Sequence, residues 1–310
     1  MALKWKSKAL LIKIETTYGV DAVPTAGANA ILALNVSLNP MEGDDVARDI
    51  EKPFFGANPT IPVNVRAQLS FDVELVGSGT AGAAPAFGPL LRMCAAAEVV
   101  TAGSKVEYTP ITDNIESGSI YFYIDTVRHV LLGSAGTAVL KTNAQGIPVV
   151  SFTLTGLFSV PSDQAKVTPV LSAFQKPVVV SKANTPTFTI GGTPFVMREF
   201  SLDFGNDVQP RMLVGQEAIL VVDRSEKVMA KVEAVSMATY NPFALALAQT
   251  TQAIQLIHGT VAGKKVQVDV ASAQLQRPTG YENQQGIAEW PLSFVPLPTA
   301  GNDQWKLTFN

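Results

Sequence analysis

The sequence contains one cysteine, few charged residues and no long hydrophobic run. With Cys94 alone, neither an intramolecular disulfide framework nor a cysteine-rich zinc site is possible. The apolar run after the basic N-terminal residues, at residues 9–12, is too short for the core of a signal peptide. No stretch approaches the roughly 20 apolar residues of a membrane-spanning helix. We therefore expect a protein that is kept in the cytoplasm, or assembled there into a larger structure, without contact with a membrane.

Charge is scarce and nearly balanced. Charged residues make up 16% of the 310 residues and apolar residues 47%, whereas about 25% of an ordinary soluble domain is charged. This composition indicates a surface covered by partners, or simply a large β core. The formal net charge of −3 argues against a basic surface that grips nucleic acid. The length allows one large β domain or two of medium size.

Catalytic and metal-binding motifs are also missing. His129 and His258 lie in or at the end of predicted strands, without a second histidine or cysteine at ligand spacing. The sequence has no Gly-x-Ser-x-Gly, phosphate-binding loop or His-Glu-x-x-His motif. Asp44, Asp45 and Asp49 lack the spacing of a calcium loop, which favours solvated loop charge. We expect no catalytic residue, no metal site and no cofactor, and therefore a protein that is not an enzyme.

The most informative stretch that is present covers residues 63–75. Its apolar residues fall at every second position, with polar residues between them. Because side chains alternate between the two faces of a strand, the pattern predicts one strand with an apolar face and a polar face. The predicted strand is far longer than the usual 5–6 residues or so. Such a strand needs a core on one side and water, or a water-filled space, on the other.

Shorter elements surround this strand. A strand is predicted over residues 31–39, followed by a long irregular connection over residues 41–62. The spacing of four apolar residues then predicts a short helix in which Cys94 is buried: Phe87, Leu90, Leu91 and Cys94. Four further strands are predicted, the middle two joined by a turn at residues 133–136: 119–125, 127–132, 137–142 and 148–158.

The same order of elements recurs in the second half of the sequence. Strands are predicted over 195–204 and 227–234, separated by an irregular connection that starts at 205–211. Asn241 and Pro242 then begin a short helix whose apolar stripe is Phe243, Ala246 and Leu247. Residues 286–294 correspond to residues 146–154. We expect two copies of one fold, divided as follows: an N-terminal arm over 1–30, a first domain over 31–161, a linker with an entry strand over 162–194 and a second domain over 195–310.

Several segments carry a family resemblance. The segments 266–275, 286–287, 292–298 and 305–310, together with 15–21, 146–148 and 152–156, resemble major tail tube proteins of long-tailed, siphovirus-type bacteriophages. The resemblance covers nearly the whole chain. It implies a mainly β fold with two tandem tube-type β-sandwich or barrel domains, each with a short flanking α-helix and a long inter-strand loop.

The resemblance also implies an assembly. In this family the inner sheets of neighbouring domains join into a barrel around a lumen, through which the genome is delivered into the host. Most members carry one tube domain and form hexameric rings, so two copies in one chain imply a homotrimer that forms a pseudo-hexameric ring. The implied location is the tail of the virion, after assembly in the host cytoplasm. The implied partners are further copies of itself, the tape measure protein, the tail terminator, distal tail proteins and transiently passing double-stranded DNA.

Two groups of residues are expected to serve this assembly. The candidates for the lumen wall are polar-face residues of the predicted strands: Asn35, Ser37, Asn64, Gln68, Ser70, Asp72, Glu74, Glu199, Ser201, Asp203 and Glu233. Arg66 and Lys231 are the basic exceptions on these faces. By the resemblance, the connection 41–62 reaches the adjacent ring, and its charged candidates are Glu42, Asp44, Asp45, Arg48, Asp49, Glu51 and Lys52.

Other functions stay open at this point. A carbohydrate-binding or adhesin-like β-sandwich would show exposed aromatic residues on loops. Trp5, Trp290 and Trp305 lie instead near the N-terminus or in predicted C-terminal strands. A secretion-system tube of related fold differs little in its physics.

Overall fold

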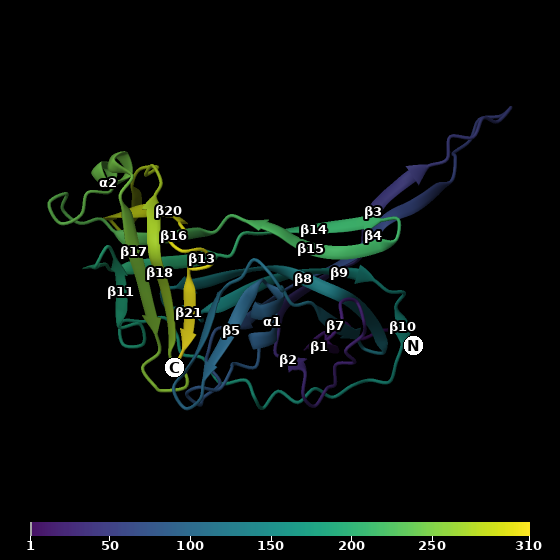
Figure 1. Cartoon of the computed structure of the whole chain (residues 1–310), viewed down its shortest axis with the longest axis horizontal. Coiled ribbons are helices and arrows are strands. Elements are labelled where there is room, and N and C mark those ends of the chain that lie inside the picture. The colour runs from purple at the N-terminus through teal and green to yellow at the C-terminus, as the bar shows by residue number, and fades with distance from the viewer. Residues whose placement is uncertain (1) are drawn as a thin grey trace.

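The computed structural model describes residues 2–310 and is built almost entirely of strands (Figure 1). The first half of the chain contains these elements: β1 (Lys8–Ile14), β2 (Ala30–Ile31), β3 (Leu34–Ala47), β4 (Thr60–Glu74), α1 (Gly88–Met93), β5 (Ala96–Thr101), β6 (Lys105–Pro110), β7 (Gly118–Ile124), β8 (Val127–Asn143), β9 (Val149–Phe158) and β10 (Ser162–Asp163). The second half contains these: β11 (Thr187–Ile190), β12 (Thr193–Pro194), β13 (Met197–Asp203), β14 (Asn206–Leu213), β15 (Gln216–Arg224), β16 (Lys227–Glu233), α2 (Pro242–Ala248), β17 (Thr251–His258), β18 (Val266–Leu275), β19 (Glu282–Gln284), β20 (Ile287–Pro296) and β21 (Lys306–Phe309). The predicted fold class, mainly β with sandwich domains and short helices, is confirmed.

One antiparallel ladder runs through both halves of the chain. Its strands pair in the order β3, β4, β9, β8, β13, β16, β20 and β19. The junction between the halves is the pairing of β8 with β13, in which Leu140 lies opposite Leu202. The predicted long strand is confirmed as β4, whose residues Leu69, Phe71 and Val73 are buried while the residues between them are partly exposed.

A second layer covers the apolar face of this ladder. In the first half it consists of β1, β7 and the beginning of β8. In the second half β11, β17, β18 and β21 pair in sequence, and β21 continues onto β6 and β5 of the first half through the pair Leu307 and Tyr108. A single hydrophobic cluster fills the space between the layers of both halves, including the stacked rings of Phe204 and Trp305. The two halves therefore share a core.

The two helices differ in burial. In α1, Leu90 and Leu91 are buried together with Cys94 at the C-cap, as the apolar spacing predicts. In α2, Asn241 is the N-cap and its side chain accepts a hydrogen bond from the Ala244 backbone N–H. The predicted stripe of α2 is correct at Ala246 and wrong at the other two positions, because Leu247 is 87% exposed and Phe243 is 37% exposed. Leu245 packs against the core beside Ala246, and the ring of Phe243 contacts the ring of Tyr281.

The predicted turn at residues 133–136 is also wrong. The chain continues through these residues as one strand, β8, which changes register against β9 between Leu132 and Ala135. Gly133 has φ +56°, and the ring of Tyr18 occupies the place where a Cβ would lie, so only glycine fits here. The resulting bulge allows β8 to leave the second layer and enter the long ladder.

Both predicted irregular connections contain hairpins. β3 and β4 remain paired as far as Ala47 and Thr60, so only residues 48–59 form a loop within the predicted connection 41–62. Residues 206–211 belong to β14, which forms a two-stranded sheet with β15. The distal part of the β3–β4 hairpin is exposed on both faces over most of its length. β14 alternates partly buried residues such as Val208 with exposed residues such as Asp207, but Pro210 within it argues against a strand.

Candidate functional site

The long ladder presents one polar face, defined by residues that lie directly opposite one another. Asp72, Ser151, Val139, Asp203 and Lys227 are consecutive partners from β4 to β16. Side chains of directly opposed residues in antiparallel strands point to the same side of the sheet. The polar side chains of both halves therefore lie on a single continuous face, opposite the shared core.

Ten of the eleven residues predicted for the lumen wall lie on this polar face: Asn35, Ser37, Gln68, Ser70, Asp72, Glu74, Glu199, Ser201, Asp203 and Glu233. The structure thus brings together residues that lie as far apart in sequence as β3 and β16. Asn64 is the exception. It lies farther along the β3–β4 hairpin, where its side-chain amide donates to the Asp44 carboxylate at 3.0 Å.

Cross-strand hydrogen bonds hold the polar side chains of the first half. Asp72 accepts hydrogen bonds from the Asn35 amide at 2.8 Å and the Ser151 hydroxyl at 2.6 Å. The Lys141 ammonium donates to the same Ser151 oxygen at 3.1 Å. These bonds connect β3, β4, β9 and β8 across the polar face. They restrict the Asp72 carboxylate to one orientation.

An ion-pair cluster occupies the same face in the second half. The Arg198 guanidinium contacts three carboxylates: Glu289 at 2.6 Å, Glu199 at 2.6 Å and Glu282 at 3.0 Å. The hydrogen bond with Glu289 is the main reason that the pKa of Arg198 is raised. Lys231 adds contacts with Glu199 at 3.4 Å and with Glu282 at 3.3 Å. The basic exception Lys231 is therefore paired with neighbouring acids.

The charge of the polar face is small and negative. Its carboxylates include Asp72, Glu74, Glu199, Asp203 and Glu233, and its ammonium groups are those of Lys141, Lys227 and Lys231. The other basic exception, Arg66, lies toward the β3–β4 hairpin and contacts Glu42 at 3.5 Å. The face thus combines many hydrogen-bonding groups with little excess charge.

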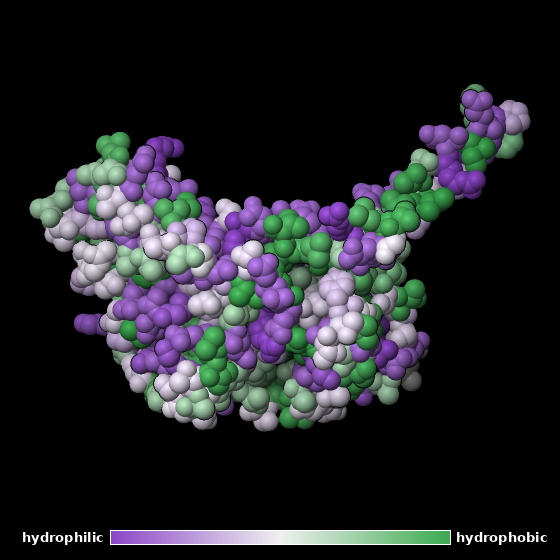
Figure 2. Space-filling model, viewed as in Figure 1, coloured by the Kyte–Doolittle hydropathy of each residue, from purple (hydrophilic) through white to green (hydrophobic). Residues whose placement is uncertain are grey.

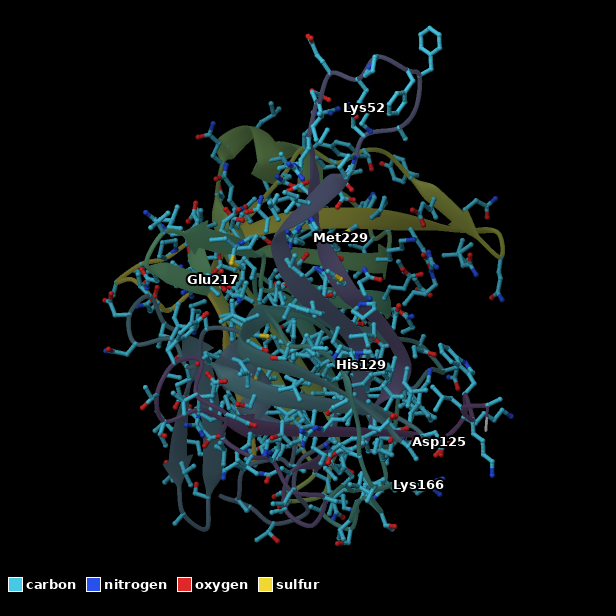
Figure 3. All side chains as sticks on the ribbon, turned by 90° about the vertical axis from the view of Figure 1, so that its right-hand side faces the viewer. Lys52, Asp125, His129, Lys166, Glu217 and Met229 are labelled. Atoms are coloured by element: carbon cyan, nitrogen blue, oxygen red, sulfur yellow. The ribbon has the colours of Figure 1, made fainter. Side chains whose placement is uncertain are left out.

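The distal part of the β3–β4 hairpin, residues 41–65, projects from the body of the molecule and is called the arm here (Figure 1). Figure 2 shows hydrophobic and hydrophilic residues mixed along the arm. Of the predicted inter-ring residues, Glu42, Asp44 and Asp45 lie on β3, and the other four lie in the loop 48–59: Arg48, Asp49, Glu51 and Lys52. Lys52 stands at the end of the arm, where its ammonium donates to the Ala57 carbonyl at 3.2 Å (Figure 3). Phe54 and Phe55 are exposed in this loop.

The β14–β15 hairpin behaves differently, because it lies on the first half of the same chain. Asn206 donates to the backbone carbonyls of Cys94 at 2.8 Å and Gly136 at 3.0 Å. The Ile219 backbone N–H donates to the Tyr18 hydroxyl at 2.6 Å, and burial raises the pKa of Tyr18. Sequence reasoning missed this hairpin. The apolar run at residues 218–222 was the available signal for β15.

A buried carboxylate organises the attachment site of this hairpin. Glu15 Oε1 accepts hydrogen bonds from the Ser119 hydroxyl at 2.8 Å and the Gly133 backbone N–H at 2.9 Å. Its Oε2 accepts from the Ser117 hydroxyl at 2.7 Å and the Gly19 backbone N–H at 2.9 Å. Glu15 thereby fixes the segment that carries Tyr18. No pattern in the sequence predicts this role of Glu15, apart from the family resemblance of residues 15–21.

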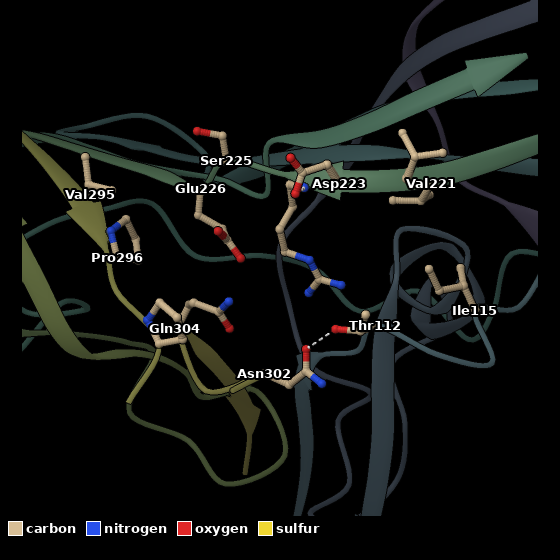
Figure 4. A pocket seen from close by; sticks show the side chains of 13 residues that line it. Thr112, Ile115, Val221, Asp223, Ser225, Glu226, Val295, Pro296, Asn302 and Gln304 are labelled. Atoms are coloured by element: carbon tan, nitrogen blue, oxygen red, sulfur yellow. Dashed lines mark hydrogen bonds between the residues drawn. The ribbon is translucent and has the colours of Figure 1, made fainter. Parts of the chain in front are cut away.

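A cavity of about 390 Å³ lies between β15 and the end of β20 (Figure 4). Glu226 is buried at its wall, and burial raises the pKa of this carboxyl group. Across the cavity, the Thr112 hydroxyl donates to the Asn302 side-chain oxygen at 2.8 Å. These groups form no nucleophile and base pair. Within residues 2–310 no group of three or more metal-ligating side chains comes together, and no helix has the length and apolarity to cross a membrane.

The chain thus combines a shared-core β architecture with one polar sheet face, a projecting arm and a docked hairpin. The family model of phage tail tube proteins matches residues 5–298. The chain therefore belongs to the phage tail tube protein family, and it is a structural subunit of the tail tube in the virion. Comparison with curated proteins gives no match. Nothing favours the carbohydrate-binding or adhesin-like alternative.

Proposed function

We propose that three copies of this chain form a ring, that rings stack into the tail tube, and that the polar face lines the lumen through which double-stranded DNA enters the host. The observation that carries the proposal is the pairing of β8 with β13, which joins the two halves into one ladder with one polar face. A ladder that is already continuous across two repeats is suited to continue into further copies. Three chains supply six repeats, the number in a hexameric ring of one-domain family members.

The chemistry of the polar face suits the passage of DNA. Duplex DNA carries one negative charge per ~1.7 Å of its axis, and cationic surfaces bind it by releasing counterions. On the polar face Lys231 is neutralised by Glu199 and Glu282, while Lys141 donates to Ser151. Acids outnumber the lysines. Such a wall hydrates the passing duplex without retaining it.

The arm is proposed to reach the adjacent ring. Its charged residues and the exposed Phe54 and Phe55 provide both polar and apolar contacts for a neighbouring subunit. The proposed assembly takes place in the host cytoplasm. The tape measure protein would occupy the lumen during assembly, and the tail terminator and distal tail proteins would cap the two ends of the tube.

The lumen assignment is tested by reversing charge on the polar face. We expect Asp72→Lys with Glu74→Lys to leave tubes with threefold rings visible by electron microscopy, and to reduce DNA delivery by at least tenfold in infectivity assays. A matched control, Asp113→Lys with Asp163→Lys, makes the same charge change at exposed positions off the polar face. Normal delivery by the first variant, with tubes intact, would show that this face does not line the lumen.

A further inference from the structure

The long ladder ends in two open edges. Within residues 2–310, β3 pairs only with β4, and β19 pairs only with β20, so each has one side without a partner strand. These edges lie at opposite ends of the ladder. On β3, Val36 and Leu38 pack partly against the core but stay partly exposed. On the β19 side, Tyr281 is 55% exposed although its ring contacts Phe243 and Trp290.

The chain contains an internal example of how such edges meet. At the junction of the two halves, β13 pairs with β8, with Ser201 opposite Lys141 and Leu202 opposite Leu140. There Phe200 and Leu202 are 1% and 0% exposed. The pairing of β13 with β8 therefore goes with full burial of apolar side chains that, at the open edge of β3, stay partly exposed.

The ladder registers show which residues are equivalent in the two halves. Leu38 connects through Leu69 to Leu154, and Leu202 connects through Val228 to Phe294. Leu38 of β3 thus occupies the position that Leu202 has in β13. This equivalence takes Leu154 as the counterpart of Phe294, from the sequence correspondence of 146–154 with 286–294.

The same comparison applies to the other edge. Lys141 lies opposite Val149 at the start of β9, and Glu282 lies opposite Glu289, the residue that corresponds to Val149 in β20. Glu282 thus holds the position of Lys141, and Tyr281 holds that of Leu140.

From these equivalences we infer that the partner of the β3 edge is the β19 edge of a second copy of this chain, in the register of the internal junction. Ser37 of one copy then lies opposite Glu282 of the next, and Leu38 lies opposite Tyr281. This inference rests on the proposed ring and specifies the contact between its subunits.

The chemistry of the inferred pairs fits this register. Leu38 covers the exposed ring of Tyr281 on the core side, replacing the pair of Leu202 and Leu140. On the polar face the Ser37 hydroxyl meets the Glu282 carboxylate, and Asn35 meets Gln284, so no like charges oppose each other. Contacts of two different edges are heterologous and build a ring when the rotation between copies closes, whereas β3 against β3 would produce an isolated dimer.

The inference is tested by disulfide formation between Ser37→Cys and Glu282→Cys in one chain. Residues directly opposite in antiparallel strands have Cα atoms ~4.5–5.5 Å apart, within the range that a disulfide spans. The protein is assembled under reducing conditions, checked by electron microscopy and then oxidised. We expect most of the chain to run as a covalent trimer on non-reducing gels, and as a monomer when oxidised at dilution before assembly. Cys94 is buried and does not compete.

The control pairs Ser37→Cys with Asn283→Cys, because Asn283 is adjacent to Glu282 but points to the other side of the sheet. We expect at least tenfold less cross-linked product from this control. If the Ser37 and Glu282 variant fails to assemble, Leu38→Cys with Tyr281→Cys tests the same register from the core side. Tubes that form without cross-links in either pair would overturn the register and leave the proposed function standing. Wild-type protein that forms neither rings nor tubes would overturn the proposed function itself.

Discussion

Replacing Glu15 by glutamine tests whether one buried carboxylate attaches the N-terminal segment and the β14–β15 hairpin to the first half. In the wild type, each carboxylate oxygen accepts one hydroxyl hydrogen and one backbone N–H. The hydroxyls of Ser117 and Ser119 can rotate and become acceptors, but the N–H groups of Gly19 and Gly133 cannot. Whichever way the glutamine amide turns, its NH₂ group faces one of these backbone donors.

The expected loss follows from that mismatch. An unsatisfied buried donor costs about 1–3 kcal/mol, and hydrogen bonds to a charged group contribute more than neutral ones. We expect Glu15→Gln to lower the free energy of unfolding by about 2–4 kcal/mol. For a chain of 310 residues, whose unfolding entropy is about 0.65 kcal/mol/K, that corresponds to a fall in Tm of roughly 3–6 °C.

Thermal unfolding followed by circular dichroism measures this change, with Glu51→Gln in the exposed loop 48–59 as the matched control. Trypsin adds a local measurement. Arg211 is exposed on β14, and we expect faster cleavage there because Gly19 no longer holds Tyr18 against Ile219. A fall in Tm of less than about 1 °C, with unchanged cleavage at Arg211, would refute the role of Glu15.

Two further predictions concern backbone geometry and pH. Gly205, at the start of the β14–β15 hairpin, has φ +59°, and a Cβ there would lie 2.0 Å from the Ser225 carbonyl oxygen. Gly205→Ala should therefore lower stability by at least ~1–3 kcal/mol. Gly215→Ala at the hairpin turn, where φ is +93° and no atom is near, should cost less in the same unfolding measurement. Burial lowers the pKa of His258, whose ring contacts the Val178 carbonyl and the Thr185 hydroxyl. Because the folded chain binds this proton less tightly than the unfolded chain, whose histidine pKa is about 6.5, stability falls as pH drops through and below that value. His258→Gln should lose less stability than the wild type between pH 7.5 and pH 5.5; equal losses would contradict the assignment.

Several elements were predictable because one of their faces is buried. The alternation in β4 reports the core directly, since Leu69, Phe71 and Val73 point into it and the residues between them do not. The same reasoning explains why α1 was found from Leu90, Leu91 and Cys94. The N-cap of α2 was found for a local reason, because the Asn241 side chain bonds within its own turn.

Elements that depend on distant contacts were not predictable in this way. β14 and β15 are exposed over most of their length and attach to the first half through Asn206, Tyr18 and a few buried residues of β15. β8 is continuous because it begins in the second layer and ends in the long ladder. Its glycines lie where it passes from one to the other, and in the sequence alone they resemble a turn. Leu247 of α2 stays exposed although its spacing predicts burial, because the helix packs on the core through Leu245 and Ala246.

Two properties could be predicted from the sequence alone: the protein is mainly β, and its strands carry a polar face opposite an apolar one. These properties are local or periodic, so the spacing of residues predicts them. The union of the two polar faces could not be predicted in this way, because it depends on the pairing of β8 with β13, which joins residues far apart in sequence. The same holds for which strand edges stay open. Edge exposure depends on what every other strand pairs with, and no local pattern encodes that.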